Sequence, residues 1–248
     1  MAILWQRQVL GRTYEVRGAG QTRRLYTDGV FHSQYNPNQP VTGSIWDLLL
    51  LPAFFYPRGK MKNILVLGVG GGAVIQQFQY FLKPENIIGI ELNPNHLYVA
   101  KKYFGIKDAN VSLIQADAIK WVKNNSNKKF DLIVDDLFGE EDGEPVRAIE
   151  ANVSWFNALS RMLVKDGCLV SNFVSSRELK QCAYFKTRSV RQNFNSAFKF
   201  GASGYENAIG AFLKIPASAQ VLKKNLIGTP KLNPTLKTSR LNFNMQRL

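Results

Sequence analysis

The chain has 248 residues, 45% of them hydrophobic and 12% aromatic. A chain of this length and composition can bury one sizeable core, which excludes a wholly disordered polypeptide. Its only cysteines, Cys168 and Cys182, form no CxxC pair, which excludes a disulfide-stapled secreted domain and favours buried thiols in a reducing, cytoplasmic setting. The formal net charge of +14 attracts anionic partners, although a solvated basic surface explains it equally well.

We expect neither a targeting segment nor a membrane-spanning one. The opening residues MAILWQRQVL combine a short apolar run with Arg7, which does not fit a secretory signal. The longest uncharged apolar run, residues 48–57, is shorter than the roughly 20 residues that a spanning helix needs, and Pro52 interrupts it. This run is therefore expected in the protein core, without contact with a membrane.

Residues 1–45 are expected to form a small N-terminal antiparallel β-domain. Alternating segments such as RTYEVRG and TRRLYTDGVFHSQY occur with the turn signals DG and NPNQP. The next segment, SIWDLLLLPAFFYP, predicts a buried helix that ends at Pro57.

Strand-like and helix-like segments alternate through residues 46–215. Continuous apolar strands separated by helices indicate a mostly parallel sheet covered on both faces, so the predicted fold class is α/β, a doubly wound Rossmann-like domain. The expected strands are NILVLGV, NIIGIEL, VSLIQAD, FDLIVDD, CLVSNFV and AIGAFLKI, and the expected helices are AVIQQFQYFL, PNHLYVAKKYF, AIKWVKNN and NVSWFNALSRML.

The positive charge is concentrated at the C-terminal end of the chain. Residues 177–248 carry 13 basic and 2 acidic side chains, whereas residues 61–176 carry 12 and 13. Basic and aromatic residues interleave in AYFKTRSVRQNFNSAFKF, a composition that could hold nucleic acid, although Phe185, Phe194 and Phe198 also fit the buried face of a helix, which we favour. Residues 216–248 are basic and contain three prolines, which predicts an extended or loosely docked tail.

A glycine-rich turn follows the first expected strand of the α/β domain. Gly68, Gly70, Gly71 and Gly72 occupy the turn, where a backbone without side chains lets a ligand approach closely beside a helix N-terminus. Glu91 ends the next strand 19 residues past Gly72, near the ~20 expected of an acid that accepts hydrogen bonds from a ribose diol. The pair predicts a nucleoside site, and GVGGGA also satisfies the loose dinucleotide pattern.

A second acid favours an adenosyl compound over a dinucleotide. Asp117 ends the third strand, where its carboxylate could accept from an adenine amino group while the backbone at Ala118 reads the ring edge. The competing interpretation is that Asp117 is the N-cap of the helix AIKWV, and both roles can hold together. A glycine turn, a ribose acid and a base acid at three successive strand ends are typical of enzymes that use S-adenosylmethionine.

From about residue 24 to 215 the chain resembles the polyamine aminopropyltransferases, of which spermidine synthase is the type. This family is a branch of the S-adenosylmethionine-dependent methyltransferase fold. The resemblance implies a small N-terminal β-domain, S-adenosylmethionine or its decarboxylated form as the donor, a small-molecule amine as the acceptor, and a role in polyamine biosynthesis. It is carried by LYTDGVF, ILVLGVGGGA, IGIELNP, QADAIKWV, FDLIVDD and WFNALSRMLVKDGCLV, in this order.

The resemblance also indicates a catalytic base at the end of the fourth strand. The family's catalytic aspartate lies five residues after an earlier aspartate, and counting from Asp131 gives Asp136. The neighbouring Asp135 is the alternative. Adjacent residues on one strand point to opposite faces, so only one of the two is expected to address the substrate.

Several family positions are changed in this chain. Gly139 replaces a second aspartate that binds the polyamine, and Gly71 replaces an acid that contacts the amino end of the donor. His32 occupies the position of a glutamine that follows DG, and the resemblance therefore implies that His32 helps to bind the donor. The family's Tyr-Gln-Glu is replaced around SIWD. Losing the acid at Gly71 favours intact S-adenosylmethionine, because that acid would repel the carboxylate of the donor.

The strand with Asp135 and Asp136 leads into an acidic segment. Six of the chain's 18 acids lie within residues 135–144, which would attract a cationic acceptor, or else form a solvated loop. The histidines, His32 and His96, accompany no cysteine cluster, so we expect no metal site, and His96 is expected on the surface of its helix.

Three functions remain open at this stage. The first is a spermidine synthase-like transferase with a divergent amine acceptor and Asp136 as its base. The second is a methyltransferase, with nucleic acid recognised through the basic C-terminal third as one option. The third is a non-catalytic nucleoside-binding homologue. The sequence allows a homodimer and does not determine the oligomeric state.

Overall fold

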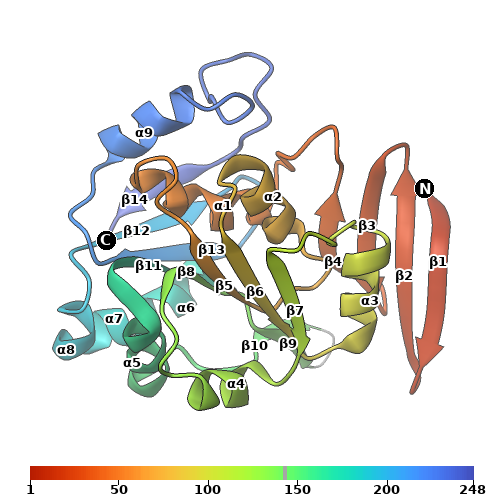
Figure 1. The fold of residues 1–248 in the computed structure, drawn as a ribbon, viewed down its shortest axis with the longest axis horizontal. Coiled ribbons are helices and arrows are strands. Elements are labelled where there is room, and N and C mark those ends of the chain that lie inside the picture. Colours follow the sequence, from red (N-terminus) through yellow and green to blue (C-terminus); the bar gives the residue numbers. More distant parts are fainter. Residues whose placement is uncertain (142–143) are drawn as a thin grey trace.

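A computed structural model describes residues 1–141 and 144–248, which form a small N-terminal sheet beside a larger α/β unit (Figure 1). The small sheet is antiparallel in the order β1-β2-β3-β4. Its turn at Asp28 and Gly29 has φ of 49° and 83°, the positive values that a tight hairpin requires, as the DG signal predicts. The four strands are β1 (Ala2–Val9), β2 (Arg12–Ala19), β3 (Thr22–Thr27) and β4 (Val30–Tyr35).

The large sheet has eight strands in the order β14-β12-β13-β11-β8-β5-β6-β7 among the described residues. The strands from β11 to β7 pair in parallel, and β13, β12 and β14 pair antiparallel. The predicted α/β class is confirmed, and the strands and helices expected from the alternation of apolar segments are all present. The strands are β5 (Asn63–Leu67), β6 (Asn86–Glu91), β7 (Val111–Gln115), β8 (Phe130–Asp135), β11 (Leu163–Phe173), β12 (Ser196–Gly201), β13 (Ala208–Leu213) and β14 (Asn244–Arg247).

Helices cover both faces of this sheet, because successive strand residues point to opposite sides. Ile64 and Val66 of β5 face one hydrophobic cluster, and Leu65 and Leu67 face the other. The helices of the first face are α1 (Ile45–Leu50), the 3-10 turn η1 (Leu51–Phe55), α2 (Ala73–Phe81) and α9 (Ala219–Ile227). Those of the second are α4 (Ala118–Asn124), α5 (Val153–Met162), α6 (Ser176–Gln181), α7 (Ala183–Lys186) and α8 (Arg188–Arg191).

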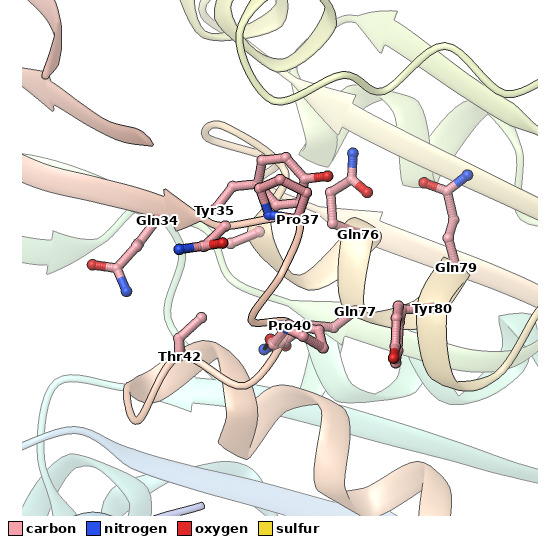
Figure 2. Close-up of a pocket in the computed structure, with 11 residues that line it drawn as sticks. Gln34, Tyr35, Pro37, Pro40, Thr42, Gln76, Gln77, Gln79 and Tyr80 are labelled. Atoms are coloured by element: carbon pink, nitrogen blue, oxygen red, sulfur yellow. Dashed lines mark hydrogen bonds between the residues drawn. The ribbon is translucent and has the colours of Figure 1, made fainter. Parts of the chain in front are cut away.

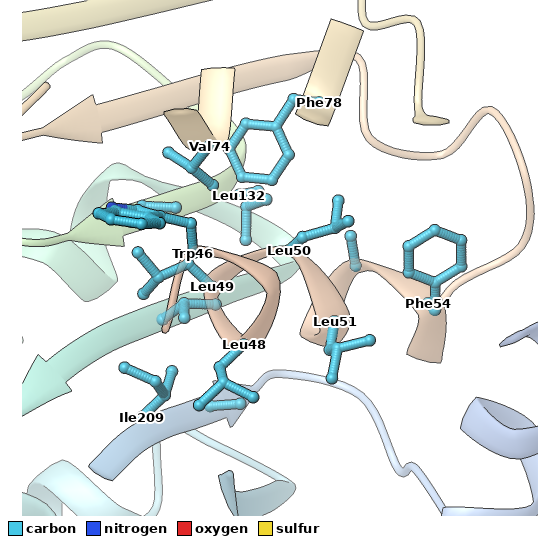
Figure 3. Close-up of a cluster of buried hydrophobic side chains, with 14 of the residues drawn as sticks. Trp46, Leu48, Leu49, Leu50, Leu51, Phe54, Val74, Phe78, Leu132 and Ile209 are labelled. Atoms are coloured by element: carbon cyan, nitrogen blue, oxygen red, sulfur yellow. The ribbon is translucent and has the colours of Figure 1, made fainter. Parts of the chain in front are cut away.

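The apolar segment near residue 50 lies in the core, as predicted. Leu48, Leu49, Leu50 and Leu51 are fully buried, and Figure 3 shows their side chains directed to different neighbours around α1, including Phe78 of α2. The helix continues as η1 and ends at Tyr56, so the predicted end before Pro57 is correct. No helix within residues 1–141 or 144–248 is long and apolar enough to cross a membrane.

The helix expected around Phe194 and Phe198 is wrong. Only α7 and α8, of four residues each, form there, and Ser196–Gly201 is strand β12. The aromatic residues are nevertheless core: Phe198 stacks on Phe55 at 4.5 Å between ring centroids, and Phe194 is buried. Pairing with β13 supplies backbone hydrogen bonds that local spacing does not reveal.

The segment after residue 215 is more ordered than its composition indicates. Leu222 and Leu226 lie one helical turn apart on α9 and are buried in the first core cluster. Asn225 donates to the carbonyl of Phe54 at 2.8 Å, and β14 adds an edge strand next to β12. Residues 216–248 therefore do not form an extended tail.

Candidate active site

The glycine turn lies where the order of the parallel strands reverses. In the order of the sheet, β6 and β7 follow β5 on one side, while β8 lies next to β5 on the other side. Crevices at such switch points, outside the carboxyl ends of the strands, are where open α/β sheets bind ligands. Gly68 ends β5 there with φ of 84°, and a Cβ atom would lie 2.1 Å from the carbonyl oxygen of Asp136. Glycine is required because the two strand ends meet.

The backbone amides of the turn are all engaged within the protein. Gly68 N–H donates to Ile90 O and Gly72 N–H to Val69 O, at 2.9 and 2.8 Å. Gly71 N–H donates to the Ser33 hydroxyl at 2.8 Å. The amides of Val69 and Gly70 donate to Glu91 Oε2 at 3.0 and 2.8 Å. A pyrophosphate needs such amides as donors, so this turn suits a ligand without phosphate and disfavours the dinucleotide interpretation.

Glu91 lies against the glycine turn, next to the crevice. Besides the amides of Val69 and Gly70, its carboxylate accepts from the amide of Asn93 at 2.9 Å. Burial raises the pKa of Glu91, and these three amides oppose the rise. A carboxylate offers about four acceptor positions, so about one remains for a ribose hydroxyl. The assignment of Glu91 as the ribose acid stays a prediction.

Two histidines flank Glu91 from different elements. His32 of β4 and His96 of α3 (Pro94–Lys102) lie with ring centroids 4.8 Å apart. His96 shares a hydrogen bond of 2.9 Å with the Thr27 hydroxyl, and its Nδ1 lies 3.7 Å from Glu91 Oε1. His96 is 8% exposed, which corrects the expected surface position. Burial lowers its pKa to about 4, so the ring is neutral near pH 7.

The N-terminal sheet supplies a wall of the site, where His32 was a predicted donor-binding residue and Ser33 was missed. Ser33 of β4 is 1% exposed and accepts from the amide of Gly71. The carbonyl oxygen of His32 lies 3.3 Å from where a Gly70 Cβ would be. The motif LYTDGVF ends one residue before His32, so proximity in sequence was the only available signal.

Asp117 caps helix α4, which favours the structural interpretation. Its Oδ1 accepts from the amide of Lys120 at 3.0 Å, and Ala118 begins the helix as a buried residue. The preceding Ala116 donates to the carbonyl of Glu91 at 3.0 Å, so Asp117 follows the strand end next to Glu91. Contact of Asp117 and Ala118 with an adenine ring stays a prediction.

Replacing Asp117 separates its two roles. Asp117→Ala should lower the free energy of unfolding by about 1 kcal/mol through loss of the cap and should also weaken donor binding. Asp117→Ser keeps a capping hydroxyl but does not reach as far, so it should retain stability and lose affinity. Urea unfolding and calorimetry with the adenosyl donor provide the readouts. Normal donor affinity in Asp117→Ser would show that Asp117 only caps the helix and does not bind the donor.

The structure distinguishes the two aspartates at the end of β8. Asp135 is 1% exposed, and its Oδ2 accepts from Arg147 at 2.8 Å and from the Trp155 indole at 3.2 Å. Arg147 comes from β10 (Glu144–Arg147), which pairs with β9 (Phe138–Glu141). Asp135 is thus one half of a buried ion pair. Asp136 is partly exposed, and its Oδ1 accepts from Asn172 at 2.8 Å.

The environment of Asp136 increases its affinity for a proton. Burial, the most important cause, raises its pKa to about 6, and the charges of Asp135 and Glu91 act in the same direction. The hydrogen bond from Asn172 and the charge of Arg147 lower it. A carboxyl with a pKa near 6 is ionised at neutral pH and is a better proton acceptor than an ordinary aspartate.

Two cavities lie near these residues. The larger, of about 500 Å³, is lined by apolar side chains, by Arg147 and by glutamates. Its full lining is Phe138, Pro145, Val146, Arg147, Glu150, Val174, Glu178, Glu206 and Asn207. The smaller, of about 230 Å³, is lined by β4, the loop after it and α2, and Figure 2 shows Tyr35, Gln76 and Tyr80 around it. None of the predicted site residues lines either cavity.

The remaining predictions concern a metal site, the acidic segment and the cysteines. In the part of the chain that the structure describes, no group of three or more His, Cys, Asp or Glu side chains could hold a metal ion. Asp142, one of the acids in the predicted loop, lies outside the described residues. The expected encounter of an acceptor with this loop stays a prediction. Cys168 and Cys182 are buried free thiols, as expected.

The fold and the crevice together define a protein with the S-adenosylmethionine-dependent methyltransferase-like fold. The family model named spermine/spermidine synthase domain matches residues 47–204, more than half of the chain. The chain therefore belongs to the spermine/spermidine synthase family.

Individual relatives agree with this assignment. The polyamine aminopropyltransferase of Buchnera aphidicola subsp. Schizaphis graminum is 21% identical over 255 residues, which covers 98% of this chain and 79% of the relative. The same enzyme from Buchnera aphidicola subsp. Acyrthosiphon pisum is 31% identical over 85 residues, which spans 32% of this chain and only 29% of the relative. A probable spermidine synthase from Corynebacterium glutamicum superposes with a TM-score of 0.75 at 15% identity, covering 100% of this chain and 91% of that structure, and so shares the fold.

The two glycines that replace acids of the family lie in different surroundings. At Gly71, a Cβ atom would lie 2.8 Å from both the Phe104 ring and the Ser33 Cβ, so the position has no room for a side chain. At Gly139 on β9, no atom lies within 4 Å of an added Cβ. Packing against Phe104 and Ser33 therefore excludes an acid at position 71, whereas position 139 would accept one.

Proposed function

We propose that this protein transfers an aminopropyl group from decarboxylated S-adenosylmethionine to an amine acceptor, with Asp136 as the base. The observation that carries the proposal is the position of Asp136: its backbone lies against Gly68 at the strand switch point, and burial raises the pKa of its carboxyl group. We assign the role to Asp136 and not to Asp135, because the carboxylate of Asp135 is buried against Arg147. The family's activity supports the same reaction.

The chemistry requires a neutral amine nitrogen at the moment of attack. The nitrogen lone pair forms a bond to the carbon next to the sulfonium, the carbon–sulfur bond breaks, and its electron pair leaves with the thioether. The proton that the nitrogen loses passes to the Asp136 carboxylate. Glu91 and Asp136 place negative charge beside the glycine turn, which suits a cationic donor without phosphates.

The acceptor has a candidate position in the larger cavity. Glu150, Glu178 and Glu206 line it, and their charge favours an ammonium group. Asn207 also lines it and donates to Asn172, which in turn donates to Asp136. The polyamine-binding aspartate of the family is absent at Gly139, so an acceptor other than the usual diamine is the expected substrate.

Product analysis tests the proposal. The protein is incubated with decarboxylated or intact S-adenosylmethionine and a panel of amines and RNAs, and mass spectrometry identifies the thioether and the modified acceptor. An aminopropylated amine with 5′-methylthioadenosine supports the proposal. A methylated amine or a methylated RNA, together with S-adenosylhomocysteine, would contradict the proposal and indicate methyl transfer. Donor binding without any product would indicate a non-catalytic role.

Methyl transfer is a second candidate because of Gly71. Without an acid there, the carboxylate of intact S-adenosylmethionine meets no repulsion from the turn, and Phe104 and Ser33 keep the position closed. If methyl transfer is the reaction, calorimetry should show that the intact donor binds more tightly than the decarboxylated one. Clear preference for the decarboxylated donor would contradict this expectation and strengthen aminopropyl transfer.

A further inference from the structure

Asn172 connects the proposed base to the larger cavity. It lies on β11 and is 2% exposed. Its Nδ2 donates to Asp136 Oδ1 at 2.8 Å, and its Oδ1 accepts from Asn207 Nδ2 at 3.1 Å. Its main-chain carbonyl accepts from the Arg147 guanidinium, which also holds Asp135. Both ends of the side chain and the backbone are thus fixed.

The two amide contacts determine which way the Asn172 side chain faces. An ionised carboxylate only accepts, so the atom of Asn172 that faces Asp136 must be the NH₂ group. The amide oxygen then faces Asn207, which can satisfy it only by donating its own NH₂ group. The arrangement is self-consistent in this orientation alone, and it matches the ionised form of Asp136.

We propose that Asn172 is a positioning residue for Asp136, and that Asn207 holds Asn172 in the donating orientation. Because Asn172 occupies Oδ1, the second oxygen of Asp136 is the one that takes the proton from the acceptor. Asn207 lines the cavity, so the residue that orients the amide also contacts the space assigned to the acceptor. The catalytic meaning of this pair rests on the proposed role of Asp136.

The groups around Asp136 predict the direction of the effect. Burial, Asp135 and Glu91 raise its pKa, and Asn172 and Arg147 lower it. Removing the Asn172 side chain deletes a hydrogen bond to the charged form, so the pKa should rise by about 1 above its present value near 6. Alanine retains the main-chain carbonyl that Arg147 uses, so the neighbouring ion pair remains in place.

Carbon-13 NMR of aspartate carboxyl groups measures this pKa in the free protein, with Asp136→Asn to assign the resonance. Asn172→Ala should raise the midpoint by about 1, and Asn207→Ala should raise it by less. The matched control is Asn86→Ala. Asn86 donates to Asn63 Oδ1 at 3.0 Å where β6 and β5 begin, at the edge of the sheet away from Asp136. Losing this hydrogen bond should leave the pKa of Asp136 unchanged.

An unchanged midpoint in both Asn172→Ala and Asn207→Ala would overturn the proposal. Should Asn172→Ala fail to fold, the result for Asn207→Ala, which changes a side chain at the cavity surface, decides alone. The titration needs neither donor nor acceptor, so it is independent of the proposed function. If transfer is observed, the rising limb of kcat/KM against pH should shift upward with the midpoint, since the base acts when ionised.

Discussion

Asp136→Asn is expected to reduce turnover by about 10²–10⁴-fold while donor binding remains. The asparagine side chain cannot take the proton from the attacking amine, but its carbonyl oxygen still accepts from Asn172. Turnover is followed by thioether release, and donor affinity by calorimetry. Asp131→Asn, at the opposite end of β8, is the control and should keep turnover, because among the described residues the Asp131 side chain accepts from the amides of Lys62 and Asn63, away from the site.

The same substitution is expected to stabilise the protein at neutral pH. Burial raises the pKa of Asp136 from 3.8 to about 6, so the folded protein pays a free-energy cost when this carboxyl group ionises. This cost is absent below about pH 4 and reaches its full size above about pH 6. Asparagine has no such cost. Urea unfolding should therefore show Asp136→Asn to be about 2–3 kcal/mol more stable at pH 8 and the difference to vanish near pH 4. Equal stabilities at both pH values would contradict the raised pKa.

Arg147→Met is expected to lower the free energy of unfolding by about 3–5 kcal/mol. The Arg147 and Asp135 side chains are 2% and 1% exposed and lie 2.8 Å apart, so the substitution leaves a buried carboxylate without its counter-charge. Asp135 Oδ1 already has no hydrogen-bond partner among the described residues, and only the Trp155 indole would remain on Oδ2. Urea unfolding at pH 8 measures the loss.

Two comparisons isolate the cause. Adding Asp135→Leu to Arg147→Met should recover much of the loss, because no buried charge then remains. Lys62→Met should leave the free energy of unfolding nearly unchanged, since Lys62 and Glu85 lie 2.7 Å apart but are 57% and 59% exposed, where water screens the pair. A double variant as unstable as Arg147→Met alone would show that packing, and not the unpaired charge, is responsible.

Local patterns were sufficient for most of the α/β unit. The apolar runs ending at Leu67, Glu91 and Asp135 correspond to strands, and the turn with Gly68 lies where the pattern places it. These features follow from hydrophobic periodicity and from glycine, which act over a few residues. The edge strands β12 and β14 were missed because their stability comes from pairing with distant strands.

The amino-acid sequence by itself determined the fold class, the glycine turn and the pair of acids at the end of β8. Only the tertiary structure shows that Asp135 and Asp136 have different surroundings, because Arg147 reaches Asp135 from β10 and Asn172 reaches Asp136 from β11. It also decided that His96 is buried and that Glu91 is bound by the turn. Burial and charge pairing depend on atoms brought together from distant segments, and these contacts leave no periodic signal in the sequence.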